Sequence, residues 1–304
     1  MSLYILDSGL GSELANRGFN LPSWKDSIWS AKALIDNPEL IKEIHIDNIK
    51  AGCNVITTSN YYATPVILKN HSTYPNFLEL SKIALAIAEE AIIETNSQNK
   101  VLIAGAFPPI NITFRPDLEN TEEELEEYYG DLSLIYKDRV DLILCESMSS
   151  IFTGVTAARI ACSSFKKVWL SWTTRGLNPE LLPSGENLAK AALEANRYDL
   201  DCQLINCGHA DQATQSLEIL KSHIDHFGVY ANSSKFKENE MLQKFESVDD
   251  LHHHHSKEIS ALEYSTFAKT WIDMGSKVIG GCCGTTPEHI RMILENSLSR
   301  SDIS

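Results

Sequence analysis

Apolar residues recur along the chain in short runs, each bounded by polar residues or glycine. Eight of these runs have strand character, namely 3–7, 53–58, 101–106, 140–146, 167–172, 202–207, 227–231 and 277–281. Continuous apolar runs of this length are typical of strands buried on both faces of a parallel sheet. Helical periodicity marks the segments between them, for example 37–51, 75–94, 186–197 and 210–223.

This regular alternation of strand and helix, without a domain break, predicts one (β/α)8 barrel domain over residues 1–304. One irregular insertion, at about 232–260, precedes the last helix and strand. It contains His252, His253, His254 and His255, which we interpret as an exposed loop with adventitious metal affinity at best.

Composition and charge narrow the function classes. The chain has 304 residues, of which 43% are hydrophobic and 22% charged, as in a globular protein with a sizeable core. Its 26 basic and 41 acidic residues give a net charge of -15, which argues against nucleic acid and anionic membranes as partners. The N-terminus lacks a signal-peptide pattern and no apolar run is long enough to span a membrane, so we expect a cytoplasmic protein.

Cysteines provide the main candidate chemistry. Cys282 and Cys283 are adjacent, follow an apolar run, and have glycines on both sides that permit a sharp turn. Cys207 ends another strand-like run and is followed by Gly208. The carboxyl ends of parallel strands lie on one face of a barrel, so the three thiols can meet. Three thiolates with an open fourth position are typical of a catalytic zinc site.

Other interpretations of these cysteines remain open at this point. Adjacent cysteines can be small buried hydrophobic residues, or can form a vicinal disulfide. The chain has seven cysteines, which in a reducing compartment favours metal or catalytic use over a disulfide framework. A thiol or metal sensor without turnover would use the same three residues.

Carboxylates at two strand ends suggest what the site binds. Asp7 and Glu146 each end an apolar run, and together they could hold an ammonium group, with the backbone N–H groups of Gly9 to Gly11 available for a carboxylate. A helix cap or a salt bridge is the simpler alternative for Glu146. A dinucleotide site at Gly9 and Gly11 is disfavoured, because Leu14 replaces the third glycine of that motif.

Aromatic residues near other strand ends could form a pocket wall. Tyr61 and Tyr62 follow the second predicted strand, and Trp172 ends the fifth. A loop at the carboxyl end of a strand is a reasonable position for such a wall.

Taken together, these residues resemble the homocysteine S-methyltransferase family over nearly the whole chain. The motifs that carry the resemblance are Asp7-Ser8-Gly9 with Glu13-Leu14, Ser27-Ile28-Trp29-Ser30-Ala31-Lys32, Asn37-Pro38-Glu39-Leu40-Ile41, Cys145-Glu146, Ile205-Asn206-Cys207 and Gly280-Gly281-Cys282-Cys283-Gly284-Thr285-Thr286-Pro287. The last of these is the most specific.

The resemblance implies a zinc-dependent barrel enzyme. Cys207, Cys282 and Cys283 would be the zinc ligands, and Asp7 and Glu146 would hold the amino group of homocysteine. Gly9 and Asn206, which belong to the same motifs, are expected to contact the substrate as well.

The expected reaction transfers a methyl group from S-methylmethionine or S-adenosylmethionine to the homocysteine thiolate and yields methionine. Tyr61, Tyr62 or Trp172 could then face the sulfonium of the donor through a cation–π contact. Coordination to zinc deprotonates a thiol, so the protein needs no general base. Chain length and the surroundings of Trp29 resemble the sulfonium-using branch more than the betaine-using one. A betaine-type enzyme, or transfer to another thiol or selenol, is the alternative. The expected partners are therefore small molecules.

Overall fold

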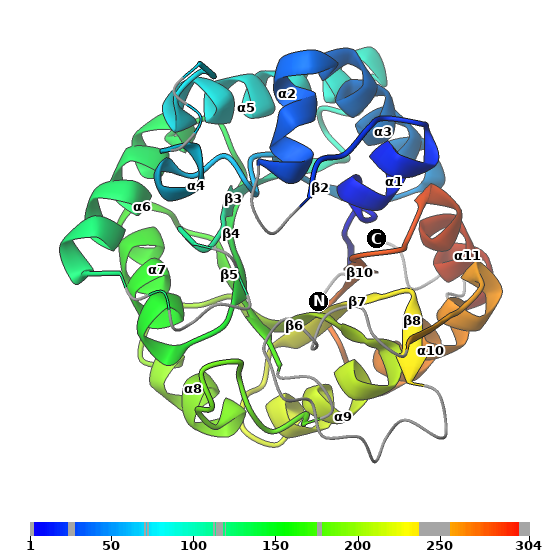
Figure 1. The fold of residues 1–304 in the computed structure, drawn as a ribbon. Coiled ribbons are helices and arrows are strands. Elements are labelled where there is room, and N and C mark those ends of the chain that lie inside the picture. Colours follow the sequence, from blue (N-terminus) through cyan, green and yellow to red (C-terminus); the bar gives the residue numbers. More distant parts are fainter. Residues whose placement is uncertain are drawn as a thin grey trace.

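The fold is an eight-stranded parallel barrel surrounded by helices, as the alternation predicts (Figure 1). The computed structural model describes residues 3–23, 28–69, 71, 73–111, 113, 118, 120–174, 178–236 and 256–297. The barrel strands are β1 (Tyr4–Ile5), β2 (Val55–Thr57), β3 (Leu102–Phe107), β4 (Leu142–Met148), β5 (Val168–Thr173), β6 (Cys202–His209), β7 (Phe227–Asn232) and β10 (Val278–Gly281). Their order is β1-β10-β7-β6-β5-β4-β3-β2, and a parallel bridge between Leu6 and Val55 joins the two ends.

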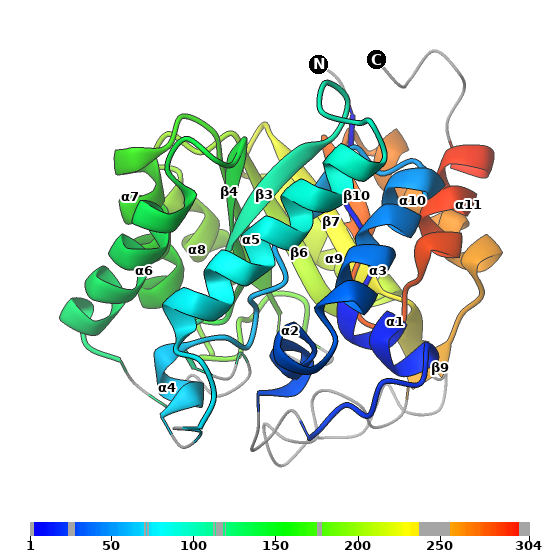
Figure 2. The same cartoon turned by 90° about the horizontal axis from the view of Figure 1, so that it is seen from above.

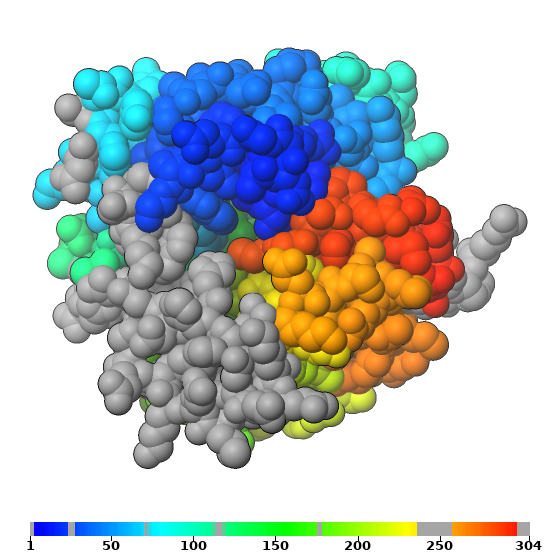
Figure 3. All heavy atoms as spheres, turned by 45° about the vertical axis from the view of Figure 1, so that its right-hand side comes forward, coloured from blue at the N-terminus to red at the C-terminus, as the bar shows by residue number. Residues whose placement is uncertain are grey.

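Helices form the outer ring. Its members are α3 (Pro38–Ala51), α5 (Phe77–Glu94), α6 (Glu122–Tyr136), α7 (Ile151–Ser164), α8 (Leu188–Ala195), α9 (Ala210–Lys221), α10 (Ala261–Asp273) and α11 (Pro287–Ser297). The shorter α1 (Leu10–Asn16), η1 (Trp29–Ala31), α2 (Lys32–Asp36) and α4 (Pro65–Leu68) complete the set. Figure 2 shows α1, α2 and α4 at one end of the barrel. The ring closes where α3 packs against α11, which brings the blue and red parts of the chain side by side (Figure 3).

Local sequence explains where several helices begin and end. The Asn37 side chain accepts a hydrogen bond from the Leu40 N–H, and Pro38 occupies the first position of α3. Gly52 ends that helix with φ 104°, a left-handed conformation that suits glycine. Thr121 and Glu124 form a reciprocal capping box at the start of α6.

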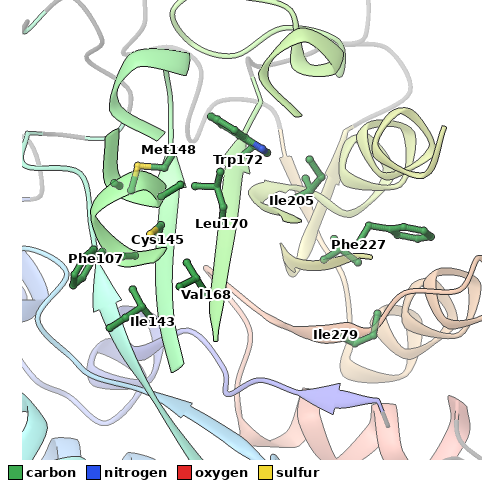
Figure 4. Packing of buried hydrophobic residues seen from close by; sticks show 14 of the residues in the cluster. Phe107, Ile143, Cys145, Met148, Val168, Leu170, Trp172, Ile205, Phe227 and Ile279 are labelled. Atoms are coloured by element: carbon green, nitrogen blue, oxygen red, sulfur yellow. The ribbon is translucent and has the colours of Figure 1, made fainter. Parts of the chain in front are cut away.

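Side-chain alternation along the strands divides the core into two layers. Residues such as Ile143, Cys145 and Leu170 point outward and pack beneath the helices (Figure 4). A smaller group, including Leu142 and Leu144, fills the interior of the barrel. This period-two pattern means that Glu146 continues the inward-facing row of β4 and points toward the barrel axis.

Two strands break this alternation near their carboxyl ends. The register of β4 against β5 shifts between Cys145 and Met148, and that of β6 against β7 shifts between Asn206 and His209. Ser147 and Cys207 lie within these irregular stretches and both have φ 59°, a conformation that costs energy for residues other than glycine. Bulges of this kind re-aim side chains beside active sites.

The predicted irregular region contains some regular structure. Its described residues include β8 (Ser234–Phe236) and β9 (Ser256–Glu258), which pair antiparallel. The four consecutive histidines, 252–255, lie outside the described residues. Among the helices that the structure describes, none combines the length and apolar character needed to cross a membrane.

Candidate active site

A cavity of about 480 Å³ lies at the carboxyl ends of the strands. This is the end of a (β/α)8 barrel at which active sites are found. Acidic residues in its lining are Asp7, Glu146 and Glu258, whereas none of the described lining residues is Lys or Arg. The cavity therefore suits a cationic ligand.

Three thiols converge in this cavity, as the sequence predicts. The sulfur atoms of Cys207, Cys282 and Cys283 all lie within 4.8 Å of one another. Zinc–sulfur bonds of about 2.3 Å in a tetrahedral site separate the sulfurs by about 3.8 Å, so the three thiols fit a single ion with small adjustments. Within the described part of the chain, no other group of three or more His, Cys, Asp or Glu side chains is close enough to share one.

The turn after β10 presents the two adjacent cysteines. Gly284 has φ +78°, and the Thr285 hydroxyl donates to the Cys282 carbonyl at 2.6 Å. The same hydroxyl accepts a hydrogen bond from the Gly9 N–H at 3.0 Å. A Cβ atom added at Gly9 would lie 2.2 Å from the Cys282 carbonyl oxygen. Glycine is therefore required at position 9, because the turn packs directly on the backbone there.

Asn232, at the end of β7, ties the two cysteine-bearing loops together. Its side-chain oxygen accepts from the Cys283 N–H at 3.1 Å, and its amide nitrogen donates to the Cys207 carbonyl at 3.2 Å. One side chain thereby fixes the relative position of β6 and the turn after β10. Sequence analysis did not identify this residue, because an Asn at a strand end has no distinctive spacing.

The clustered thiols disfavour ionisation when no cation accompanies them. Hydrogen bonds with Cys282 and Cys283, together with burial, raise the pKa of Cys207 well above its usual range. Adjacent thiolates would repel one another strongly in this setting, and a bound cation removes that repulsion. The arrangement thus suits a metal ion better than three free thiols.

Asp7 and Glu146 lie in the same cavity. The Thr57 N–H donates to Asp7 Oδ2 at 2.8 Å, and the Thr57 hydroxyl donates to Oδ1 at 3.3 Å. Burial raises the pKa of Asp7 to about 7 in spite of these bonds. Burial, and then the charge of Asp7, raise the pKa of Glu146 to about 8. Because burial disfavours the charged form of both carboxyl groups, a cation bound beside them would stabilise that form.

Aromatic side chains cover one side of the cavity. Tyr61 and Tyr62 both line it, as expected, and so does Trp29 of η1. The rings of Trp29 and Tyr62 meet edge to face with their centroids 5.3 Å apart. Tyr230, on β7, also belongs to the lining and was missed, although its position in an inward-facing row could have indicated it.

Trp172 does not line the cavity, which corrects its assignment to the donor pocket. Its indole is fully buried in the layer between sheet and helices, and its N–H donates to Gln203 Oε1 at 2.9 Å (Figure 4). The ring packs on Gly154 of α7, where an added Cβ would lie 2.5 Å from it. Its neighbours on β5, Ser171 and Thr173, take the inward positions because side chains alternate.

Asn206 and Gly9 have partners within the protein. Asn206 is buried outside the cavity lining, where it accepts from Ser171 and donates to Ser147 at 2.7 Å and 2.6 Å. Its side chain therefore supports the bulge of β4 instead of facing a ligand. Gly9 lines the cavity, but its N–H is already bonded to Thr285, so it does not offer the free donor that the sequence suggested.

Comparisons with known proteins agree with this architecture. The family described as homocysteine S-methyltransferase matches residues 4–297. The homocysteine S-methyltransferase of Escherichia coli (strain K12) is 28% identical over an alignment that covers 97% of this chain and 95% of that protein. For the homocysteine S-methyltransferase YbgG of Bacillus subtilis (strain 168), the identity is 27%, with coverages of 96% and 93%. The metallated form of the homocysteine methyltransferase MmuM from Escherichia coli superposes with a TM-score of 0.77 at 25% identity, covering 98% of this chain and 97% of that one.

The fold and the matches define a methyltransferase built on a (β/α)8 barrel. The chain belongs to the homocysteine S-methyltransferase family. Membership of this family supports methyl transfer to homocysteine, and the three-cysteine cluster is a group that can hold a metal ion.

Proposed function

We propose that the protein transfers a methyl group from a sulfonium donor, S-methylmethionine or S-adenosylmethionine, to the sulfur of homocysteine, with zinc held by Cys207, Cys282 and Cys283. The observation that carries this proposal is the convergence of three thiols in a cavity that contains two partly buried carboxyl groups and, in its described lining, no Lys or Arg. Thiolates are preferred zinc ligands, and an acidic cavity attracts a cationic donor.

Asp7 and Glu146 are proposed to bind the amino group of homocysteine. Burial raises the pKa of both carboxyl groups, and the charge of Asp7 raises that of Glu146 further. An ammonium bound beside them would favour their charged forms, so the pair suits an amine. With the amine fixed there, the thiol of the same molecule can extend toward the three cysteines. When bound, zinc lowers the pKa of a coordinated thiol and so supplies the acceptor as a thiolate at neutral pH.

The methyl donor is proposed to lie against the aromatic side of the cavity. Tyr61, Tyr62 and Trp29 present ring surfaces there, and a sulfonium is attracted to such faces. The acceptor sulfur gives an electron pair to the methyl carbon as the bond to the donor sulfur breaks. That bond's electron pair leaves the donor as a neutral thioether. The thiol proton would leave to solvent when the homocysteine sulfur binds zinc, so no residue need act as a general base. The residues of the chain contribute alignment and exclusion of water.

The test is methionine formation from homocysteine by zinc-loaded protein, with S-methylmethionine, S-adenosylmethionine and betaine supplied separately. Turnover with either sulfonium and none with betaine is the expected result. Turnover with betaine alone would replace the sulfonium by a quaternary ammonium donor, which the same acidic cavity could attract. If the protein binds zinc stoichiometrically but turns over with none of the donors, the zinc-site assignment stands and the proposed reaction is wrong.

A further inference from the structure

His45 is a buried histidine whose ring lacks hydrogen-bond partners. It lies in the middle of α3, has 2% of its surface exposed, and belongs to the lining of the cavity. Neither Nδ1 nor Nε2 makes a hydrogen bond to any described residue. Buried polar groups in native proteins nearly always have a partner, and leaving one without costs stability. The ring is therefore expected to gain a partner when the cavity is filled.

Asp7 is the group placed to become that partner. Its Oδ2 atom lies 4.0 Å from His45 Nδ1, just beyond hydrogen-bond distance. The same oxygen already accepts the Thr57 N–H and has a second lone pair free for another donor. A movement of about 1 Å by either side chain would complete the bond, since N–H···O bonds are about 2.9 Å long.

The surrounding residues show that this side of the cavity is polar. The hydroxyl groups of Ser8 and Ser59 are also buried there without a hydrogen-bond partner among the described residues. They follow β1 and β2, the two strands that α3 connects. Their presence beside Asp7 indicates a wall adapted to a polar group of a ligand.

We propose that His45 is a positioning residue for amine recognition: its Nδ1–H donates to Asp7 Oδ2 when a substrate ammonium binds between Asp7 and Glu146. This inference rests on the proposed function, because it concerns the amino group of the same acceptor. The hydrogen bond orients the Asp7 carboxylate and supports its charge. His45 itself does not touch the substrate.

A neutral histidine suits this role better than a charged one. Burial lowers the pKa of His45 to about 4, so the ring donates a hydrogen bond at neutral pH without carrying a positive charge. A cationic side chain in its place would neutralise Asp7 and compete with the ammonium of the substrate. The neutral donor leaves the negative charge of Asp7 to attract the ligand.

The experiment compares two acceptor thiols that differ in the amino group alone, homocysteine and 4-sulfanylbutanoate. Their dissociation constants for the full-length, zinc-loaded protein are measured by titration calorimetry in wild type, His45→Phe and His45→Asn. Phe keeps a flat ring but has no donor, whereas the Asn amide places a donor near the Nδ1 position. We expect His45→Phe to weaken homocysteine binding roughly tenfold and to leave 4-sulfanylbutanoate unaffected, with partial recovery in His45→Asn.

Ile41→Val serves as the control for the packing of α3, because Ile41 is buried on that helix outside the cavity lining. It should bind both thiols as the wild type does. Suppose that wild type prefers homocysteine. If His45→Phe keeps that preference, or raises the dissociation constants of both thiols by the same factor, the role of His45 is overturned while the amine site stands. If wild type binds the two thiols equally, the amine site of the proposed function fails, and the inference fails with it. Should His45→Phe not fold, His45→Leu, which also lacks a donor, takes its place. A His45→Leu protein that keeps the full preference for homocysteine would overturn the role.

Discussion

Asn232 accepts a hydrogen bond from the backbone N–H of Cys283 at 3.1 Å, and through its amide nitrogen it also holds the Cys207 carbonyl. The two loops that carry the three thiols are thus positioned by one side chain. Groups that orient ligands without binding the metal typically contribute 10- to 100-fold to metal affinity. Asn232→Ala should weaken zinc binding by about that factor, as measured by competition with a chromophoric chelator.

The control for this variant is Asn187→Ala. Asn187 caps α8 by accepting a hydrogen bond from the Lys190 N–H, so Asn187→Ala should lower thermal stability by removing a helix cap away from the cysteines. Zinc affinity should stay unchanged in that protein. Equal zinc affinity in wild type and Asn232→Ala would show that the turn after β10 holds its shape without this bridge.

Cys283→Ser should abolish stoichiometric zinc binding, and methyl transfer with it. A serine hydroxyl is a far weaker zinc ligand than a thiolate, and two remaining thiols leave the ion poorly held. Metal content after dialysis, measured by atomic emission, checks this. Cys162→Ser on α7 is the matched control and should keep both properties, because Cys162 lies outside the cavity lining. Full activity in zinc-free Cys283→Ser would contradict the proposed role of the metal.

Gly9→Ala should disrupt the cysteine turn although it adds a single methyl group. The new Cβ would lie 2.2 Å from the Cys282 carbonyl oxygen. Backbone atoms would have to move apart to relieve this clash. Overpacking of this kind costs about 1–3 kcal/mol, and here part of it displaces a proposed metal ligand. We expect lower thermal stability and weaker zinc binding together. Gly130→Ala, where an added Cβ meets no atom within 4 Å, should leave zinc binding unchanged and should not lower thermal stability, because alanine favours the interior of α6 over glycine.

Glu146→Gln should stabilise the metal-free protein at high pH. The folded state raises the pKa of Glu146 from an ordinary 4.5 to about 8, so it binds the proton more tightly than the unfolded chain does. The free energy of unfolding therefore falls as pH rises between these two values, by up to about 1.4 kcal/mol per unit. Glutamine removes that loss.

Urea unfolding at several pH values measures this effect. The stability advantage of Glu146→Gln over wild type should be smallest below pH 4.5 and grow to about 4–5 kcal/mol by pH 8.5. An advantage independent of pH would mean that the carboxyl group titrates normally in the folded protein. The same variant should bind homocysteine more weakly, since one of the two proposed amine-binding charges is gone.

Tyr62→Leu should raise the KM for the sulfonium donor by several-fold and leave the KM for homocysteine nearly unchanged. Leucine fills similar space but has no π-face, and a cation–π contact at a desolvated site is worth about 1–2 kcal/mol. Trp172→Phe provides the contrast: it loses the hydrogen bond to Gln203 and should lower stability without changing either KM. An increased donor KM in Trp172→Phe alone would restore the original assignment of that residue.

Much of the fold follows from the sequence. Eight apolar runs separated by helical segments predicted the barrel, because this alternation depends on residues close in the chain. The capping residues at the starts of α3 and α6, Asn37 and Thr121, are local signals of the same kind. The convergence of Cys207 with Cys282 and Cys283 was also predictable, since parallel strands place their carboxyl ends on one face.

Other features depend on contacts between distant segments. The bulges at Ser147 and Cys207 arise from register shifts between neighbouring strands, which no local pattern marks. Trp172 was misplaced because its position at a strand end outweighed the alternation of β5, which turns it toward α7. Gly9 looked like a free donor, and its bond to Thr285 joins residues at opposite ends of the chain. His45 resembles any other residue of an amphipathic helix until Asp7 is placed beside it.

The lack of Lys and Arg among the described lining residues has a consequence for turnover. In the proposed reaction a sulfonium enters an acidic cavity and is converted into a neutral thioether. The positive charge that favours entry disappears in the chemical step itself, and the homocysteine thiol likewise becomes a thioether. Electrostatic attraction therefore favours the sulfonium donor over its neutral thioether product at the aromatic side of the cavity, whereas the new methionine keeps the ammonium group through which Asp7 and Glu146 are proposed to hold it.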